Sequence, residues 1–297
     1  MRTKNSIFIL AALIVTSSIL MFSCKKEKAD SDTTGAADNN LAENAASDII
    51  SIGSQASDNS SGGLVSFRTG SDDQVLSSCA TVTRDTVART ITVVFSGSTC
   101  LDGRTRSGSL VFNFSGSTNG ARYFRDPGFN CSITATNYIV DGNHITINNK
   151  SITNTTPVGF NPTSTNETWH ILADISILKA NGETVGWVCD RTTTLLNTST
   201  TYTNASTPIN WLAARIGIMG SANGTRANGE TFSIVVISQL VRDFGACNVN
   251  GRHPFIQGSL DYAPSGKPVR HVDFGNGSCD LNATVMINNV TYNVVLP

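Results

Sequence analysis

From Cys79 onward, apolar and polar residues alternate in short runs that are rich in β-branched side chains. The clearest runs cover residues 109–114, 144–147, 169–177, 231–241, 283–287 and 292–296. Alternation with a period of two is typical of strands that have one buried face. Gly, Asn, Pro and Asp bound these runs, and no helical period is present. The pattern predicts a single all-β antiparallel domain over residues 75–297, with about 10–14 strands.

The turns between the runs favour a meander. Asn288 and Asn289 separate the last two runs, and because asparagine tolerates positive φ they predict a tight hairpin. Asp141-Gly142 and Asn181-Gly182 mark two further turns. Sequential strands that are joined by short turns are usually antiparallel neighbours. The sequence leaves open whether this meander forms a curved sheet, a sandwich or an open barrel.

A different pattern begins the chain. A short basic start leads into an apolar run over residues 7–22, which is followed by Ser23, Cys24 and a charged segment. This order is typical of a bacterial lipoprotein signal peptide. The apolar run is too short to span a membrane as a helix, which needs about 20 apolar residues. We therefore expect residues 1–23 to be cleaved and Cys24 to be acylated. A plain signal peptide and an uncleaved anchor are the alternatives.

Residues 24–74 are rich in Ser, Asp, Asn, Ala and Gly, which predicts a flexible tether. One part differs, because apolar residues recur at helical spacing between Leu41 and Ile50, behind Asp38, a favoured N-cap residue. A short helix near residues 40–56 is therefore expected. It could dock on the β domain or remain a nascent helix in a flexible arm.

Cysteine content indicates disulfides. Without Cys24, the remaining cysteines are Cys79, Cys100, Cys131, Cys189, Cys247 and Cys279. An even number in an exported chain favours disulfide bonds, although free cysteines can also act as small buried hydrophobes. Each of two predicted hairpins starts and ends near a cysteine, which predicts Cys79–Cys100 and Cys247–Cys279. The pair Cys131–Cys189 follows by elimination.

Charge and spacing exclude several classes of site. The formal net charge is -1 and charged residues make up 14% of the chain, so a nucleic-acid partner is not expected. No Cys-x-x-Cys occurs and no histidine lies at ligand spacing from a cysteine, so we predict no metal site and no cofactor. No catalytic spacing is recognisable either, and we predict that the chain is not an enzyme.

Two groups of side chains are candidates for binding. Trp169, Trp187 and Trp211 could stack on sugar rings, although aromatic residues also dominate the cores of β domains. Four arginines could form a patch for an anionic ligand, or could hold loops by bonding to carbonyls and to nearby aspartates. These arginines are Arg104, Arg106, Arg122 and Arg125.

Several segments resemble those of a group of envelope lipoproteins from Bacteroidota that carries no assigned activity. The segments cover residues 23–26, 79–83, 102–108, 123–128 and 272–280. The resemblance implies a cell-envelope location and no particular reaction. Together with the signal pattern, it leads us to expect an outer-membrane, lipid-anchored structural or interaction module, on either the periplasmic or the surface face. The alternative is a carbohydrate-binding surface lipoprotein, and the expected partners are the membrane together with a glycan or another envelope protein.

Overall fold

The computed structural model describes residues 30–57, 79–100, 102–121, 124–198, 214–249 and 253–296. The predicted signal peptide, Cys24, much of the predicted tether, Arg122 and Trp211 lie outside these residues. The account below concerns the compact unit that spans residues 33–297.

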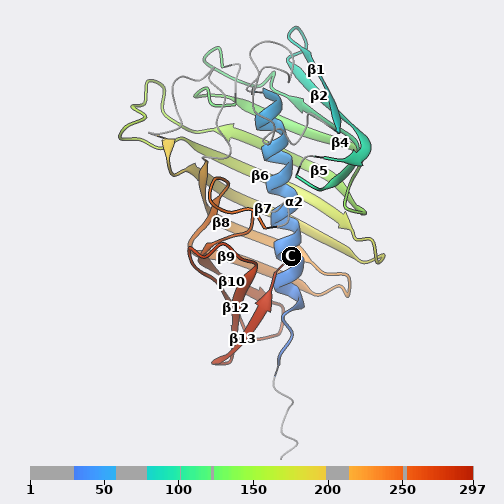
Figure 1. The fold of residues 1–297 in the computed structure, drawn as a ribbon, viewed down its shortest axis with the longest axis vertical. Helices are drawn as coiled ribbons and strands as arrows, with labels where there is room; N and C mark the ends of the chain where they lie inside the picture. The colour runs from blue at the N-terminus through green and yellow to red at the C-terminus, as the bar shows by residue number, and fades with distance from the viewer. Residues whose placement is uncertain are drawn as a thin grey trace, which may run out of the picture. The chain divides into compact units, whose positions relative to one another are not determined.

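Thirteen antiparallel strands form one sheet in which each strand pairs with the next along the chain (Figure 1). The strands are β1 (Ala80–Asp85), β2 (Thr90–Thr99), β3 (Thr105–Asn113), β4 (Asn130–Val140), β5 (Asn143–Asn154), β6 (Thr168–Leu178), β7 (Thr184–Leu195), β8 (Arg215–Thr225), β9 (Thr231–Asp243), β10 (Gln257–Pro264), β11 (Arg270–Asn276), β12 (Asn282–Ile287) and β13 (Val290–Val295). The predicted all-β meander is confirmed. Among the three alternatives it is an open curved sheet, with β1 and β13 as its edges.

The predicted turn residues adopt the backbone conformation that the tight turns require. Asn288 and Asn289 have φ angles of 49° and 62°, between β12 and β13. Asp141 and Gly142 have φ angles of 50° and 79°, between β4 and β5. Asparagine, aspartate and glycine adopt this left-handed region at low cost, which explains why they occupy these four positions.

Among the described residues one long helix, α2 (Thr34–Ser57), crosses one face of the sheet (Figure 1). We call this face of the sheet the inner face and the opposite one the outer face. The helix expected near residues 40–56 forms, begins earlier, and docks on the β unit. The segment 34–57 is therefore part of the folded unit, which corrects its interpretation as flexible tether.

Small residues allow α2 to lie directly on the sheet. A Cβ atom built on Gly35 would lie 2.2 Å from the hydroxyl oxygen of Tyr262, and one built on Gly53 would lie 2.4 Å from a ring carbon of Phe112. The apolar side chains of the helix that pack against the sheet are Ala36, Ala42, Ala45, Ala46, Ile49, Ile52 and Ala56. Two glycines lower the intrinsic stability of this helix by about 1 kcal/mol each, so its stability depends on the sheet.

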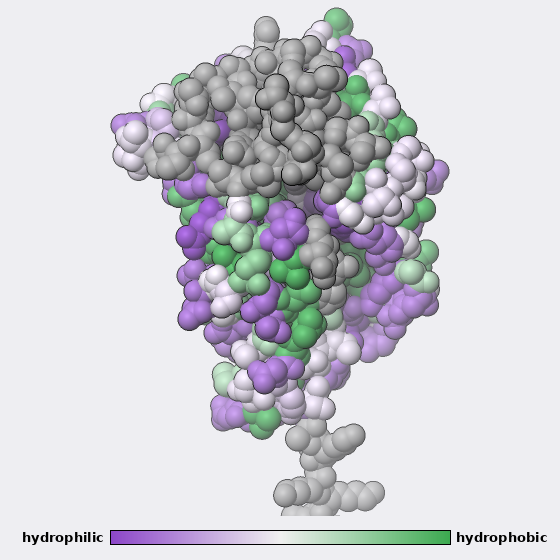
Figure 2. Space-filling view, viewed as in Figure 1, coloured by the Kyte–Doolittle hydropathy of each residue, from purple (hydrophilic) through white to green (hydrophobic). Residues whose placement is uncertain are grey.

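The core lies between α2 and the inner face. Along β6 and β7 every second residue is buried, and these positions include Ile175 and Trp187. Ala37 and Leu41 are only partly buried, and Figure 2 shows hydrophobic surface along the line of α2 among hydrophilic residues. The alternation seen in the sequence therefore separates the inner face, which packs the helix, from the outer face.

Glycines at three bulges help the sheet to curve around α2. The pairing register shifts at Gly108 in β3, at Gly220 in β8 and at Gly258 in β10. Their φ angles are 84°, 117° and 103°, and a Cβ atom at any of them would lie within 2.3 Å of a backbone oxygen on the neighbouring strand. Bulges increase the local bend of a strand, and glycine is required where backbones approach so closely.

Two of the three predicted disulfides are present. The Cα atoms of Cys79 and Cys100 lie 4.9 Å apart, and those of Cys247 and Cys279 lie 5.2 Å apart. Each bond joins the ends of a hairpin, as the strand pattern predicts.

The third predicted disulfide is wrong, because Cys131 and Cys189 are free and buried. Cys131 lies on β4 and Cys189 on β7, so the strands β5 and β6 separate them. Neighbouring strands are about 4.8 Å apart, which places the two cysteines well beyond the Cα distance of about 7 Å that a disulfide can bridge. Both thiols instead fill the core.

Candidate functional site

Polar and charged side chains form a continuous contact between α2 and the inner face, which we call the polar seam. On the helix it comprises Asp38, Asn39, Glu43, Asn44 and Asp48; on the sheet side it comprises Arg104, Arg106, Tyr138, Lys179, Trp187, Arg191, Arg226 and Arg242. Most of these side chains are buried. An ion-paired helix interface of this kind is unusual, because burying charged groups carries a large desolvation cost.

At the N-terminal part of the helix, Asp38 accepts hydrogen bonds from two cations. Its carboxylate lies 2.6 Å from Nζ of Lys179, just after β6, and 3.2 Å from Nε of Arg226, just after β8. Further carboxylates support the same cations, since Glu183 lies 2.8 Å from Lys179 and Glu230 lies 2.9 Å from Arg226. Lys267 lies 2.8 Å from Glu230 and is the third cation, so three carboxylates and three cations are matched at this end of the seam.

In the middle of the helix, Glu43 forms a bidentate pair with Arg191 of β7, at 3.2 Å from Nε and 2.7 Å from Nη2. Hydrogen bonds to two amide side chains of the helix flank this pair. Trp187 donates from its indole nitrogen to Asn39 at 3.1 Å, and Arg242 of β9 donates to Asn44 at 2.7 Å. Charge-assisted bidentate bonds are among the strongest in proteins, and they fix the rotation of α2 about its axis.

Asp48, toward the C-terminal end of the helix, accepts from Arg106 at 2.6 Å and from Tyr138 at 3.1 Å, and it lies 3.4 Å from Arg104. Burial alone would raise the pKa of Asp48, but the two arginines and the tyrosine hydroxyl overcome it, so the pKa is lowered. The carboxylate stays ionised in the folded protein. Arg106 also pairs with Asp102 at 2.6 Å, which ties the loop before β3 to the seam.

The arginines singled out in the sequence thus separate into two places. Arg104 and Arg106 belong to the seam, where they bond to aspartates, as one of the two interpretations expected. Arg125 is fully buried and pairs with the buried Glu167 of the loop before β6. Burial raises the pKa of Glu167, although its hydrogen bond with Arg125 acts in the opposite direction. The three of these arginines that the structure describes do not form one surface patch, and Arg122 lies outside the described residues.

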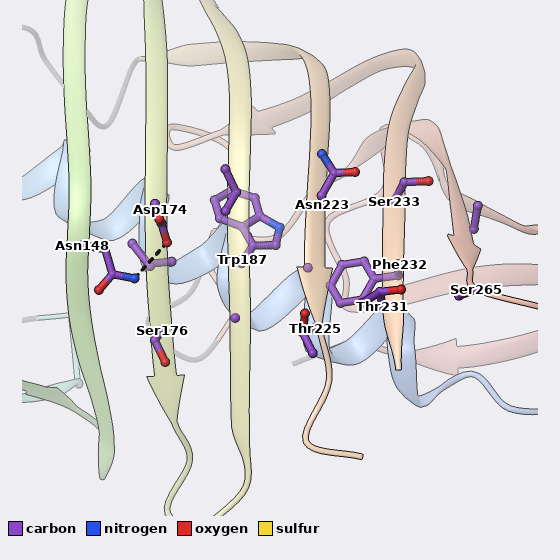
Figure 3. A pocket seen from close by; sticks show the side chains of 15 residues that line it. Asn148, Asp174, Ser176, Trp187, Asn223, Thr225, Thr231, Phe232, Ser233 and Ser265 are labelled. Carbon is purple, nitrogen blue, oxygen red and sulfur yellow. Dashed lines mark hydrogen bonds between the residues drawn. The ribbon is translucent and has the colours of Figure 1, made fainter. Parts of the chain in front are cut away.

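A shallow groove of about 720 Å³ lies on the outer face, across β5 to β10 (Figure 3). Its labelled polar side chains are Asn148, Asp174, Ser176, Asn223, Thr225, Thr231, Ser233 and Ser265. Gly186 and Gly224 also line it and contribute no side chains. Asn148 donates to Asp174 at 2.9 Å, and Asp174 is the one ionisable side chain among the lining residues. The groove therefore offers one carboxyl group among neutral hydrogen-bonding groups, and its lining has no pair of acid and base.

The tryptophans do not form the predicted sugar-stacking face. Trp169 and Trp187 are 3% and 1% exposed. Trp169 stacks on Phe124 and donates to its carbonyl oxygen at 3.0 Å, whereas Trp187 contacts the helix through Asn39. Both belong to the core, and Trp211 lies outside the described residues. The stacking hypothesis is therefore wrong for the two tryptophans that the structure describes.

Histidines lie apart from one another. His170 pairs with Asp190 and His271 with Asp261, each at 2.8 Å, on β6–β7 and β10–β11. His253 contacts the carbonyl oxygen of Cys247, and burial lowers its pKa. Within the described ranges no three His, Cys, Asp or Glu side chains are grouped as metal ligands would be.

Sequence reasoning missed the acidic side of the seam. Asp38-Asn39, Glu43-Asn44 and Asp48 recur at intervals of five residues within the segment interpreted as tether. This spacing was the available signal, because it places a carboxylate at regular intervals along a helix that also carries buried alanines and isoleucines.

Comparison with known proteins adds no relative, since no family model, curated protein or solved structure matches the chain. In the part of the chain that the structure describes, no helix has the length and hydrophobicity needed to cross a membrane.

Proposed function

We propose that this chain is a lipid-anchored protein of the bacterial cell envelope, held in the outer membrane by acylated Cys24, and that it serves as a non-enzymatic interaction module. The observation that carries the proposal is the polar seam. Helix α2 begins ten residues after Cys24 and is fixed to the sheet by buried ion pairs. The segment 25–33 is all that separates the proposed anchor from the helix, so the folded unit has a short connection to Cys24 in place of a long tether.

The outer groove supports a binding role rather than a catalytic one. General acid–base chemistry needs a positioned pair of titratable groups, and nucleophilic chemistry needs an activating base. The lining residues contain one carboxyl, Asp174, and no histidine, lysine or cysteine. A rigid sheet that carries a polar groove is instead suited to holding a partner.

Cys24→Ala is expected to move the protein from the membrane fraction to the soluble fraction and to abolish acyl labelling. Two or more acyl chains anchor a protein stably, and the variant has no cysteine to carry them. Fractionation and metabolic labelling with a fatty-acid probe measure both effects. Ser23→Ala, which keeps a small residue before the cysteine, is the control and should stay in the membrane. Membrane association of Cys24→Ala with a cleaved N-terminus would contradict the proposal.

A second candidate function is carbohydrate binding at the outer groove rather than at the tryptophans. The observation that favours it is the set of short hydroxyl and amide side chains from neighbouring strands, which match the hydroxyl groups of a sugar. Asn223 and Ser233 sit in register on β8 and β9 and both line the groove. Sites of this kind use a few positioned polar groups for orientation.

A glycan array tests this candidate. We expect the parent chain to bind a subset of glycans and Asn223→Leu to lose that binding, because the larger apolar side chain removes a hydrogen-bonding amide from the groove. Thr192→Leu is the matched control, since Thr192 is exposed on β7 and does not line the groove. Absence of glycan binding by the parent, or equal loss in both variants, would rule the candidate out.

A further inference from the structure

The middle of the polar seam carries more positive than negative charge. Lys150 of β5, Arg191 of β7 and Arg242 of β9 all interact electrostatically with the same carboxylate, Glu43. Arg242 also interacts electrostatically with Asp48, but the carboxylate of Asp48 already pairs with two other arginines. Asp190 also interacts with Arg191, but its side chain is largely exposed, so Glu43 is the one buried carboxylate that all three cations share.

These same cations have hydrogen-bond donors that remain unused. Among the described residues, Nζ of Lys150, Nη1 of Arg191 and Nε of Arg242 have no hydrogen-bond partner. The exposed fractions of the three side chains are 1%, 2% and 6%. A buried donor without a partner costs about 1–3 kcal/mol, and more when it is charged. Three such donors, on buried cations that all interact with Glu43, point to a ligand that accepts hydrogen bonds.

Short side chains share a row of the sheet with Lys150. In the sheet register Lys150 is opposite Ala173, Ala173 is opposite Cys189, and Cys189 is opposite Ala222. This row runs across β5 to β8 on the inner face, under the helix. The long side chain of Lys150 interacts with Cys189, two strands away, so it extends along the row of short side chains toward Glu43 and Arg191.

We propose that the polar seam binds a small oxyanion between Lys150 and Arg191, beneath α2, with Arg242 adding to the attraction. The chemical class is a dianion of the phosphate or sulfate type. Its oxygens would accept from Nζ of Lys150 and Nη1 of Arg191, and its charge of −2 would balance three cations that face one carboxylate. A chloride ion supplies one charge and would leave half of the excess uncompensated. The site is buried, so the anion enters when α2 opens or as the protein folds.

Thermal unfolding of the full mature chain tests the site, with inorganic phosphate titrated against sodium chloride at equal ionic strength. A ligand that binds the folded state raises Tm in a saturable manner. We expect phosphate to raise Tm in this way, and chloride to raise it by a smaller amount. Lys150→Met should weaken the apparent phosphate affinity by about tenfold or more, which corresponds to about 1.4 kcal/mol. Lys267→Met is the control, because Lys267 is a partly exposed lysine that pairs with Glu230.

Three outcomes would overturn the proposal. The first is that phosphate does not raise Tm in a saturable manner. The second is that phosphate raises the Tm of Lys150→Met and Lys267→Met equally. The third is that chloride raises Tm as much as phosphate does. Where Lys150→Met alters the fold, Lys150→Arg provides the second test, since it keeps the charge and should retain phosphate binding. A crystal grown with selenate locates the ion independently through its anomalous signal, and density elsewhere on the surface would mean an adventitious ion only.

Discussion

Replacing Glu43 with glutamine should lower the free energy of unfolding by about 3–5 kcal/mol, the cost typical of removing one partner of a buried ion pair. Glutamine keeps the size of the side chain and removes its charge. Arg191 would lose both charge-assisted bonds to the carboxylate, and Lys150 and Arg242 would lose the counter-charge that they share. The expected result is destabilisation caused by charge rather than by a cavity.

Chemical denaturation followed by tryptophan fluorescence measures this effect. Trp187 reports on the helix directly, because its indole donates to Asn39 of α2. Glu183→Gln is the matched control. Glu183 also pairs with a cation of the seam, Lys179, but its side chain is half exposed, so we expect no measurable change. Equal stability of the Glu43→Gln and parent proteins would show that the ion pairs do not hold the helix.

The loss of unfolding free energy in Glu43→Gln should depend on pH in a defined direction. Burial lowers the pKa of Lys150 from 10.5 to about 8, and Glu43 opposes that shift. A lowered folded-state pKa means that the unfolded chain binds more protons above that pKa, so stability rises with pH there. Without Glu43 the pKa of Lys150 falls further and this rise begins at a lower pH. The difference in unfolding free energy between the parent protein and Glu43→Gln should therefore become smaller as the pH is raised toward 8.

The strands were predictable because their burial follows a period of two along the chain. The same rule also contained information about the tryptophans. Trp169 shares its parity with Ile171 and Ile175 on β6, and all three are buried. A tryptophan that lies an even number of residues from the isoleucines of an alternating run shares their face of the sheet and belongs to the core. This position along the strand is more informative than the composition of the neighbouring residues.

Elimination was a weaker argument than register for the cysteines. Hairpin geometry brings the ends of two adjacent strands together, and both pairs predicted in that way are present. Cys131 and Cys189 had no such local argument. Pairing them required knowledge of which strands are neighbours, and in a meander two residues on β4 and β7 are always separated by the two strands between them.

The polar seam was not predictable from the periods that reveal secondary structure. Hydrophobic periodicity detects faces that avoid water, whereas α2 is held by charged side chains whose burial depends on partners far along the chain. Asp38 pairs with Arg226, which lies 188 residues later. Polar composition made the segment resemble a tether, and only the fold brings its carboxylates to the arginines of the inner face.

The curvature that forms the inner face should fail when Gly220 is replaced by alanine. Gly220 has φ = 117°, and a Cβ atom there would lie 2.3 Å from the carbonyl oxygen of Asp190 on β7. A non-glycine residue at positive φ costs about 1–2 kcal/mol. The clash adds to this cost, because it is with backbone and cannot be relieved by a change of rotamer. We expect a total loss of about 3 kcal/mol or more, which exceeds the typical effect of a point substitution.

Gly229→Ala separates the two contributions. Gly229 also has a positive φ, 80°, but no atom lies within 4 Å of a Cβ built there, so only the cost of about 1–2 kcal/mol for the backbone conformation is expected. Gly220 is directly opposite Arg191 in the pairing of β7 with β8, so the clash should also displace the arginine that binds Glu43. Gly220→Ala should therefore increase hydrogen exchange in α2, whereas Gly229→Ala should not. Equal losses of stability with unchanged exchange in the helix would mean that the bulge does not position the seam.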